Sequence, residues 1–92
     1  MIFSWNDDKN AWLKLHRHVS FEQIVVAIEE GQLLAFLDHP NTVKYENQVL
    51  LLVNYSDYVY VVPVIKSSDE FFMKTIFPSR KYTAHYLKGG TK

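Results

Sequence analysis

The sequence predicts one α+β domain in which helices pack against an antiparallel sheet. Helical patterns occupy the first third of the chain, apolar runs of strand length fill the middle, and one short helical pattern follows them. The 92 residues are 48% hydrophobic, which excludes a disordered chain and indicates a packed core. We expect this domain to cover residues 1–88 and a flexible tail to cover residues 89–92.

The composition also excludes several classes of protein. No apolar run approaches the roughly twenty residues that span a bilayer, so we expect no membrane partner. The chain has no cysteine, which excludes disulfides and thiolate metal sites and fits a reducing compartment. Asp7 and Asp8 stand where a signal peptide would carry positive charge. We therefore expect a cytoplasmic protein.

A first helix is predicted over about residues 8–18, after a short strand over residues 2–5. Side-chain oxygens that can accept the free N–H groups of its first turn are those of Asn6, Asp7 and Asp8. Apolar residues recur at near-helical spacing and predict its buried face, namely Trp12, Leu13, Leu15 and Val19.

A second helix is predicted between Ser20 and Gly31. Ser20 and Gln23 have the spacing of a capping box, in which each side chain binds a backbone N–H of the other residue. Val19 and Ile24 stand at the positions of a hydrophobic staple. Gly31 is a typical residue just beyond a helix end.

Four strands and a last short helix are predicted after Gly31, with the strands over residues 33–37, 48–55, 58–66 and 71–77. Ser56-Asp57 predicts a tight hairpin turn between the second and third of them. Pro63 predicts a bulge or an edge position, because proline has no N–H to give to a neighbouring strand. The last helix should begin after Pro78-Ser79, and we expect the helices to pack on one face of the sheet.

The zero net charge conceals a division between the two parts of the chain. Residues 1–70 hold all ten carboxylates and five basic residues, a net charge of −5, whereas residues 71–92 hold five basic residues and no acid. A field polarised in this way suits an anionic ligand that docks near the C-terminal segment.

The last third of the chain carries residue types that RNA cleavage without a metal needs. Such cleavage activates a 2′-hydroxyl, protonates the leaving 5′-oxygen and stabilises negative charge on the transition state. Arg80 suits the last role because its planar guanidinium pairs with two phosphate oxygens at once. Candidates for proton transfer are His85, Tyr86 and, from the first helix, His18.

Further basic and aromatic residues are candidates for binding RNA, namely Lys74, Lys81, Tyr82, Lys14 and Arg17. Lys14, Arg17 and His18 form a second patch that would extend a groove if the first helix lies beside the last strand. Each feature also has a structural interpretation, because cations favour a helix C-terminus and tyrosines four residues apart can pack on a sheet. The spacing of the four histidines does not predict a metal site.

Two parts of the chain resemble the BrnT family of toxins. Trp5-Asn6-Asp7-Asp8-Lys9, followed ten residues on by Val19-Ser20-Phe21-Glu22, resembles the family's Trp-Asp-x-x-Lys and Val-Ser-Phe-Glu-Glu elements. Ser79-Arg80-Lys81-Tyr82-Thr83 resembles its Ala-Arg-Lys-Ala-Thr, placed between the last strand and the last helix. The resemblance covers most of the chain in the order of elements, and specific residues only at the two ends.

This resemblance implies a RelE-like fold and the toxin of a type II toxin–antitoxin system, a ribonuclease without cofactor that arrests translation. It implies RNA and a cognate antitoxin, a small DNA-binding repressor, as partners, and it adds Lys9 to Arg80 and Lys81 as a site residue. Leu13 stands where the family usually has Asn, and His16-Arg17-His18 stands where it has Lys-His-Gly. A proton-transfer role of the family's histidine could therefore pass here only to His16 or His18.

The alternative from another class is a non-catalytic RNA- or protein-binding module of the same fold. The sequence does not distinguish a homodimer from a toxin–antitoxin hetero-oligomer, and it does not identify the general acid and base.

Overall fold

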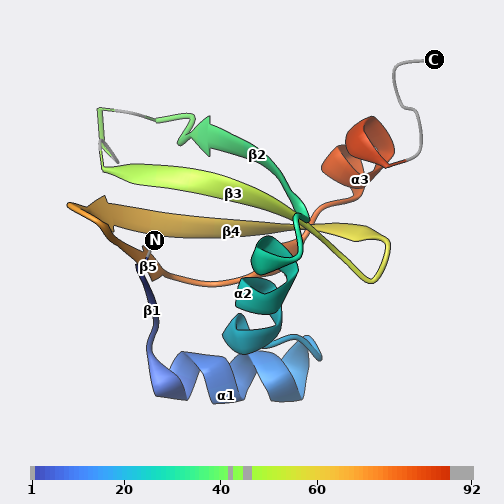
Figure 1. The fold of residues 1–92 in the computed structure, drawn as a ribbon, viewed down its shortest axis with the longest axis horizontal. Helices are drawn as coiled ribbons and strands as arrows, with labels where there is room; N and C mark the ends of the chain where they lie inside the picture. Colours follow the sequence, from blue (N-terminus) through green and yellow to red (C-terminus); the bar gives the residue numbers. More distant parts are fainter. Residues whose placement is uncertain (1, 42, 45–46, 88–92) are drawn as a thin grey trace.

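The computed structural model describes residues 2–41, 43–44 and 47–87, and it is an α+β fold with three helices and a mostly antiparallel open sheet of six strands (Figure 1). The elements in chain order are β1 (Ile2–Ser4), α1 (Asp7–His16), α2 (Phe21–Glu29), β2 (Leu33–Asp38), β3 (Gln48–Tyr55), β4 (Tyr58–Ser67), β5 (Glu70–Met73), β6 (Phe77–Pro78) and α3 (Arg80–Tyr86). The predicted α+β class is confirmed. The predicted domain end at residue 88 and the tail over residues 89–92 lie outside the described residues.

The sheet has the order β1-β5-β4-β3-β2, and β6 also pairs with β4. All pairs are antiparallel except β1 with β5, where the N-terminal strand joins the sheet in parallel. The predicted hairpin between β3 and β4 is confirmed, since Tyr55 pairs with Tyr58. Ser56 and Asp57 have φ angles of 55° and 59°, the two positive values of a type I′ turn.

Pro63 lies in the middle of β4, a strand that has neighbours on both sides. On one side it stands opposite Leu50 of β3, and on the other side the neighbouring chain is interrupted between β5 and β6. The register there changes by one residue, because Val64 pairs with Met73 whereas Val61 pairs with Phe77. The predicted bulge or edge position of this strand is therefore wrong, since β4 is central and pairs regularly with β3; the irregularity lies on the chain beside Pro63, to which Pro63 has no N–H to offer.

Helix α2 packs against one face of the sheet, and α1 lies beyond it and adds Leu13 to the same core (Figure 1). Phe21 and Ile24 of α2 are fully buried there, and the ring of Trp5 stacks on Phe21 with 5.6 Å between centroids. Burying a large apolar side chain contributes about 2 kcal/mol. The sheet supplies alternating residues to this core, namely Leu51, Val53, Val62, Val64, Phe71 and Met73.

Helix α3 packs on the opposite face, so the prediction that the helices share one face is wrong for α3. Its Tyr82 and the following Leu87 lie against a second core cluster, made of Leu52, Val59 and Val61. The two clusters use alternate residues of β3 and β4, which point to opposite faces of a sheet. Figure 1 shows α3 apart from α1 and α2.

The buried side of α1 also differs from the prediction. Asn10 and Leu13 are buried, whereas Trp12 is 39% exposed and Leu15 is 73% exposed. The buried amide of Asn10 is satisfied, because its Oδ1 accepts the N–H of Phe21 at 2.8 Å. Polar contact with α2 thus decides which side of α1 faces inward, and the apolar pattern alone does not show this.

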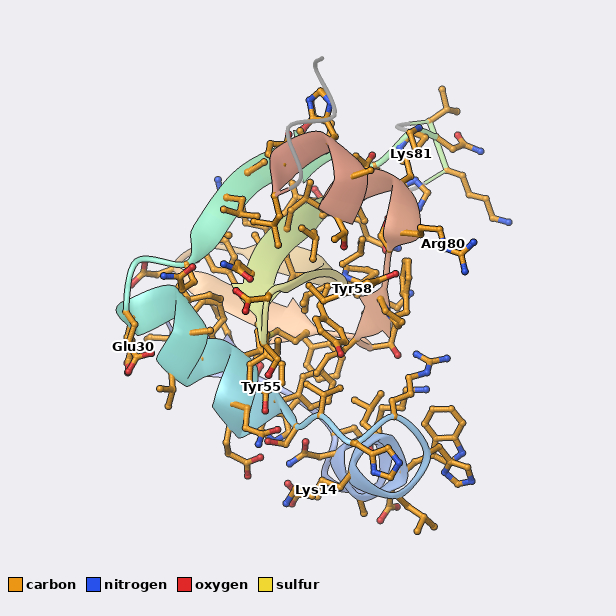
Figure 2. The ribbon with its side chains drawn as sticks, turned by 90° about the vertical axis from the view of Figure 1, so that its right-hand side faces the viewer. Lys14, Glu30, Tyr55, Tyr58, Arg80 and Lys81 are labelled. Atoms are coloured by element: carbon orange, nitrogen blue, oxygen red, sulfur yellow. The ribbon has the colours of Figure 1, made fainter. Side chains whose placement is uncertain are left out.

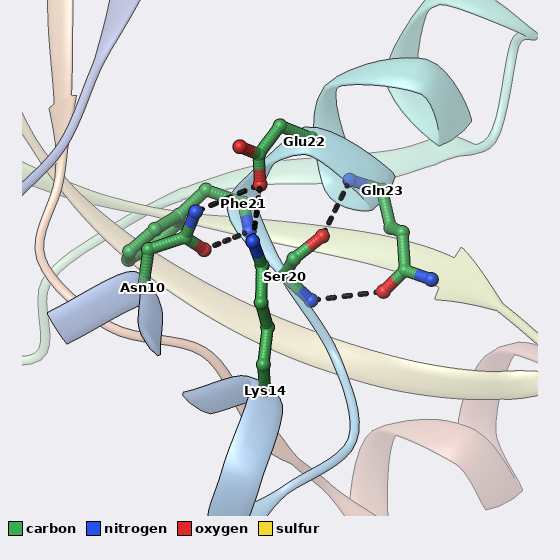
Figure 3. Close-up of polar contacts among 6 residues, drawn as sticks. All are labelled: Asn10, Lys14, Ser20, Phe21, Glu22 and Gln23. Carbon is green, nitrogen blue, oxygen red and sulfur yellow. Dashed lines mark hydrogen bonds and ion pairs between the residues drawn. The ribbon is translucent and has the colours of Figure 1, made fainter. Parts of the chain in front are cut away.

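The predicted capping box at the start of α2 is confirmed. Ser20 Oγ accepts the N–H of Gln23 at 3.1 Å, and Gln23 Oε1 accepts the N–H of Ser20 at 2.9 Å (Figure 3). Asn10 Nδ2 donates to Glu22 Oε1 at 2.7 Å, and Lys14 Nζ lies 4.0 Å from the same oxygen. We call these contacts the α1–α2 junction.

Candidate functional site

The first turn of α3 is held to β4 by uncharged groups. The N–H of Ser79 donates to the carbonyl of Val59 at 2.9 Å, which extends the pairing of β6 with β4 by one residue. Thr83 Oγ1 accepts the N–H of Val59 at 2.8 Å and donates to the carbonyl of Ser79 at 2.7 Å. Ser79 Oγ also caps the helix by accepting the N–H of Tyr82. We call the contacts among Val59, Ser79 and Thr83 the α3 anchor.

This anchor leaves the predicted basic residues of α3 on the surface. Arg80 and Lys81 are exposed, and neither forms an ion pair within the part of the chain that the structure describes. Figure 2 shows Arg80 extending outward from the start of α3. Two cationic side chains that have no carboxylate to neutralise them retain their full attraction for an anion.

Most of the predicted chemical groups of α3 meet in a hollow of about 360 Å³, lined by Lys81, Tyr82, Ala84, His85 and Tyr86. Lys81 Nζ lies 5.6 Å from the ring centroid of Tyr82, and the rings of His85 and Tyr86 are 4.8 Å apart in an edge-to-face arrangement. A cation, an imidazole and two phenols therefore share one side of the helix.

Arg80 does not line this hollow. It precedes His85 by five residues, which is about 140° around an α-helix. The structure therefore does not bring Arg80 and His85 together, although the sequence prediction placed them at one corner. If both groups act on one phosphate, the ligand has to reach across the start of the helix.

Arg17 forms a hydrogen bond between the N-terminal helix α1 and the segment that precedes α3. Its Nη1 donates to the carbonyl of Ile76 at 2.5 Å, so the end of α1 lies beside the segment between β5 and β6. The sequence predicted that Arg17 would extend the basic surface if the first helix lay beside the last strand, and Arg17 does lie beside this segment. Lys74 is exposed at the start of the same segment, and Arg80 follows Ile76 by four residues.

Lys9 belongs to this side of α1 as well. Its Nζ lies 4.3 Å from the ring centroid of Trp12, and the guanidinium carbon of Arg17 lies 5.0 Å from the same ring. Two of the predicted RNA-binding cations thus share one exposed indole.

Lys14 and His18 lie elsewhere. Lys14 contacts Glu22, and both Lys14 and His18 line a hollow at the start of α2 with Val19, Ser20 and Gln23. In Figure 2, Lys14 lies at the bottom of the view, whereas Arg80 and Lys81 lie higher, on the right-hand side. The prediction grouped Lys14 and His18 with the basic residues of α3. In the structure they lie beside the start of α2 instead.

The α1–α2 junction alters the acidity of one carboxyl group. The pKa of Glu22 lies below its ordinary value of 4.5, chiefly because Asn10 donates a hydrogen bond to the carboxylate, with a further contribution from the charge of Lys14. On the hairpin, burial raises the pKa of Tyr60, and Tyr55 and Tyr58 raise it further.

Sequence reasoning missed three residues of this region. Trp12 was assigned to the core, Asn10 was not considered, and Thr83 appeared only within a motif. The spacing of Ser79 and Thr83 could have indicated an anchor, because a threonine in a helix can donate to the carbonyl four residues earlier. No sequence signal marks Trp12 as exposed, since its spacing to Leu15 and Val19 is that of a buried stripe.

Within residues 2–41, 43–44 and 47–87, histidine, aspartate and glutamate side chains nowhere form a group of three that could hold a metal ion. Over the same residues, every helix is too short or too polar to cross a membrane. No protein family, curated protein or solved structure matches the chain.

Proposed function

We propose that this chain is the toxin of a type II toxin–antitoxin system, a cytoplasmic, metal-independent endoribonuclease with a RelE-like fold that arrests translation by cleaving RNA. The hydrogen bond from Arg17 to the Ile76 carbonyl supports this proposal most directly. It puts Arg17, at the end of α1, beside the segment that leads into Arg80, so basic residues from both ends of the chain can contact one RNA strand. The BrnT-like motifs at the same two ends motivate the reaction class.

The proposed reaction is attack of a ribose 2′-oxygen on the adjacent phosphorus, with cleavage of the bond from phosphorus to the 5′-oxygen. The products are a cyclic phosphate, or the 3′-phosphate formed from it, and a 5′-hydroxyl. Arg80 stabilises the charge on the phosphoryl oxygens, and Lys74 and Lys81 bind neighbouring phosphates. His85 or Tyr86 transfers the protons.

A non-catalytic RNA-binding module is the second candidate. Arg80 lies outside the hollow that His85 and Tyr86 line, and this favours the binding module, because a cation and a proton donor that do not share a site do not act together on one phosphate. The same exposed cations serve binding alone. In either case the partners are RNA and, for a toxin, an antitoxin protein that covers the basic surface.

Induced expression in a bacterial host tests the proposal. The natural chain should arrest growth and fragment RNA, and Arg80→Ala should abolish both effects at equal soluble protein. Lys66→Ala is the matched control, because Lys66 is an exposed cation at the end of β4 opposite to α3, and it should remain toxic.

The outcomes separate the two candidates. Intact RNA and normal growth, from natural protein that is folded and binds RNA, would leave only the binding module. Growth arrest that persists in Arg80→Ala would retain the toxin and contradict the role given to Arg80.

A further inference from the structure

The exposed side of α1 carries an aromatic stack that the proposed reaction does not use. The rings of Trp12 and His16 lie 4.5 Å apart with 21° between their planes. His16 Nδ1 lies 3.0 Å from the carbonyl of Trp12, which fixes the imidazole against the indole. Both side chains face solvent, and Trp12 is 39% exposed. The stack is therefore accessible to a ligand from solvent.

The stack is surrounded mainly by cations. Lys9 Nζ lies 4.3 Å and the guanidinium carbon of Arg17 lies 5.0 Å from the indole centroid, so both charges meet the electron-rich ring. Asp8 stands one helical turn before Trp12 and is the acid nearest to it along α1. Arg17 is also bound to the Ile76 carbonyl and cannot turn away without breaking that hydrogen bond. The rings are therefore held in place, with two cations close to the indole.

We propose that Trp12 and His16 form a stacking platform for an unpaired base of single-stranded RNA, with Lys9 and Arg17 binding the phosphates beside that base. This inference takes its ligand from the proposed function and specifies the form of RNA that the chain accepts. Every base has a flat π-face that continues an aromatic stack, whatever its identity, and such stacking tolerates different sequences. In a duplex these faces are covered by neighbouring base pairs, so the platform selects single strands. An acidic peptide would engage the two cations and leave the rings unused.

The platform lies on the path to the proposed reaction site. Arg17 contacts both the indole and the Ile76 carbonyl, and the chain runs from Ile76 through Phe77 to Arg80. A strand whose base stacks on His16 can place a phosphate at Arg17 and continue along this segment. The platform then sets the position of the RNA, and the α3 residues act on a neighbouring nucleotide.

Trp12 can report on this contact directly. The chain has two tryptophans, and in Trp5→Phe the phenyl ring retains the aromatic packing on Phe21 while Trp12 becomes the sole indole. The probe is a single-stranded RNA of about ten nucleotides, within the size range of single-strand sites. Its 2′-hydroxyls are methylated, so it cannot be cleaved. Saturable quenching of Trp12 fluorescence that weakens with added salt is expected, and the same RNA in a duplex should quench far less.

A second measurement uses the full chain and the anisotropy of the labelled probe. Trp12→Ala should weaken binding of the single strand about tenfold, the effect of losing one stacked base. Trp12→Phe should recover much of that loss, because a phenyl ring also stacks. Leu15→Ala is the matched control, since Leu15 is 73% exposed on the same helix, and it should bind as the natural chain does.

Each unfavourable outcome has a distinct meaning. RNA binding with unchanged Trp12 fluorescence, or equal affinity for Trp12→Ala, would overturn the platform and leave the proposed ribonuclease intact. Equal quenching by a glutamate-rich peptide would overturn it in favour of an acidic protein partner. Failure of the natural chain to bind any RNA would contradict the proposed function itself.

Discussion

The α1–α2 junction and the α3 anchor each hold a helix in place, but they use different chemical groups. In the junction, a buried amide and a capping box connect two helices, and the charge of Lys14 lies against Glu22 (Figure 3). In the anchor, only the hydroxyl and backbone groups of Val59, Ser79 and Thr83 take part. Charges at the junction interact within the molecule, whereas Arg80 and Lys81 beside the anchor are exposed and form no ion pair among the described residues. An element can thus be fixed in place while its charges stay available.

Removing the centre of the junction should have the largest effect. Asn10→Ala should lower the free energy of unfolding by about 2–3 kcal/mol, because the buried N–H of Phe21 loses its acceptor and Glu22 loses its donor. Urea unfolding followed by circular dichroism measures this change. Asn47→Ala, at an exposed position, should differ from the natural chain by less than about 0.5 kcal/mol. Equal stability of the two variants would contradict the structural role of Asn10.

Breaking the α3 anchor should have a smaller and local effect. Thr83→Val leaves the buried N–H of Val59 without its acceptor, which costs about 1–2 kcal/mol. We expect α3 to detach before the sheet unfolds, so hydrogen exchange should accelerate at the amides of Tyr82 and Leu87 while β3 stays protected. Thr75→Val is the matched control, because the buried Thr75 hydroxyl has no hydrogen-bond partner within the described residues, and it should not accelerate exchange.

The smallest effect concerns the charge within the junction. The pKa of Glu22 is lowered in the folded chain, so its charged form adds stability above the ordinary pKa of 4.5. That stability is lost as the pH falls through the lowered value. Glu22→Gln keeps an oxygen for Asn10, and the stability difference from the natural chain should shrink as the pH falls below 4.5. Thermal unfolding over this pH range measures it, with Glu29→Gln, outside the junction, as the control. A difference independent of pH would contradict the assignment.

The sequence correctly predicted the structural elements that are specified by residues close together in the chain. Ser20 and Gln23 specify the start of α2, and Ser56-Asp57 specifies the hairpin, because each depends on residues close together in the chain. The buried side of α1 was predicted correctly for Leu13 and Val19 and wrongly for Trp12 and Leu15, because Asn10 finds its partners beyond the end of its own helix, in α2. A pattern of apolar residues contains no information about such a contact.

In the candidate site, too, local features could be predicted from the sequence and features that depend on tertiary contacts could not. The exposed cations of α3 could be located from the sequence, since they fall in one short segment with no acid. The distance between Arg17 and Ile76 depends on the tertiary fold, and so does the face of the sheet on which α3 lies. Arg80 and His85 were grouped because they are near in sequence, although helix geometry separates them.

The irregularity opposite Pro63 has a consequence for the later chain. Met73 and Ile76 both enter the core on the side of α1 and α2, although an odd number of positions separates them. Uninterrupted alternation would send them to opposite faces of the sheet. One extra residue between Met73 and Ile76 accounts for this, because it lets both side chains lie on the same face of the sheet. Deleting one residue between Met73 and Ile76 would let β5 continue directly into β6 beside β4, in the register that Val61 and Phe77 already have.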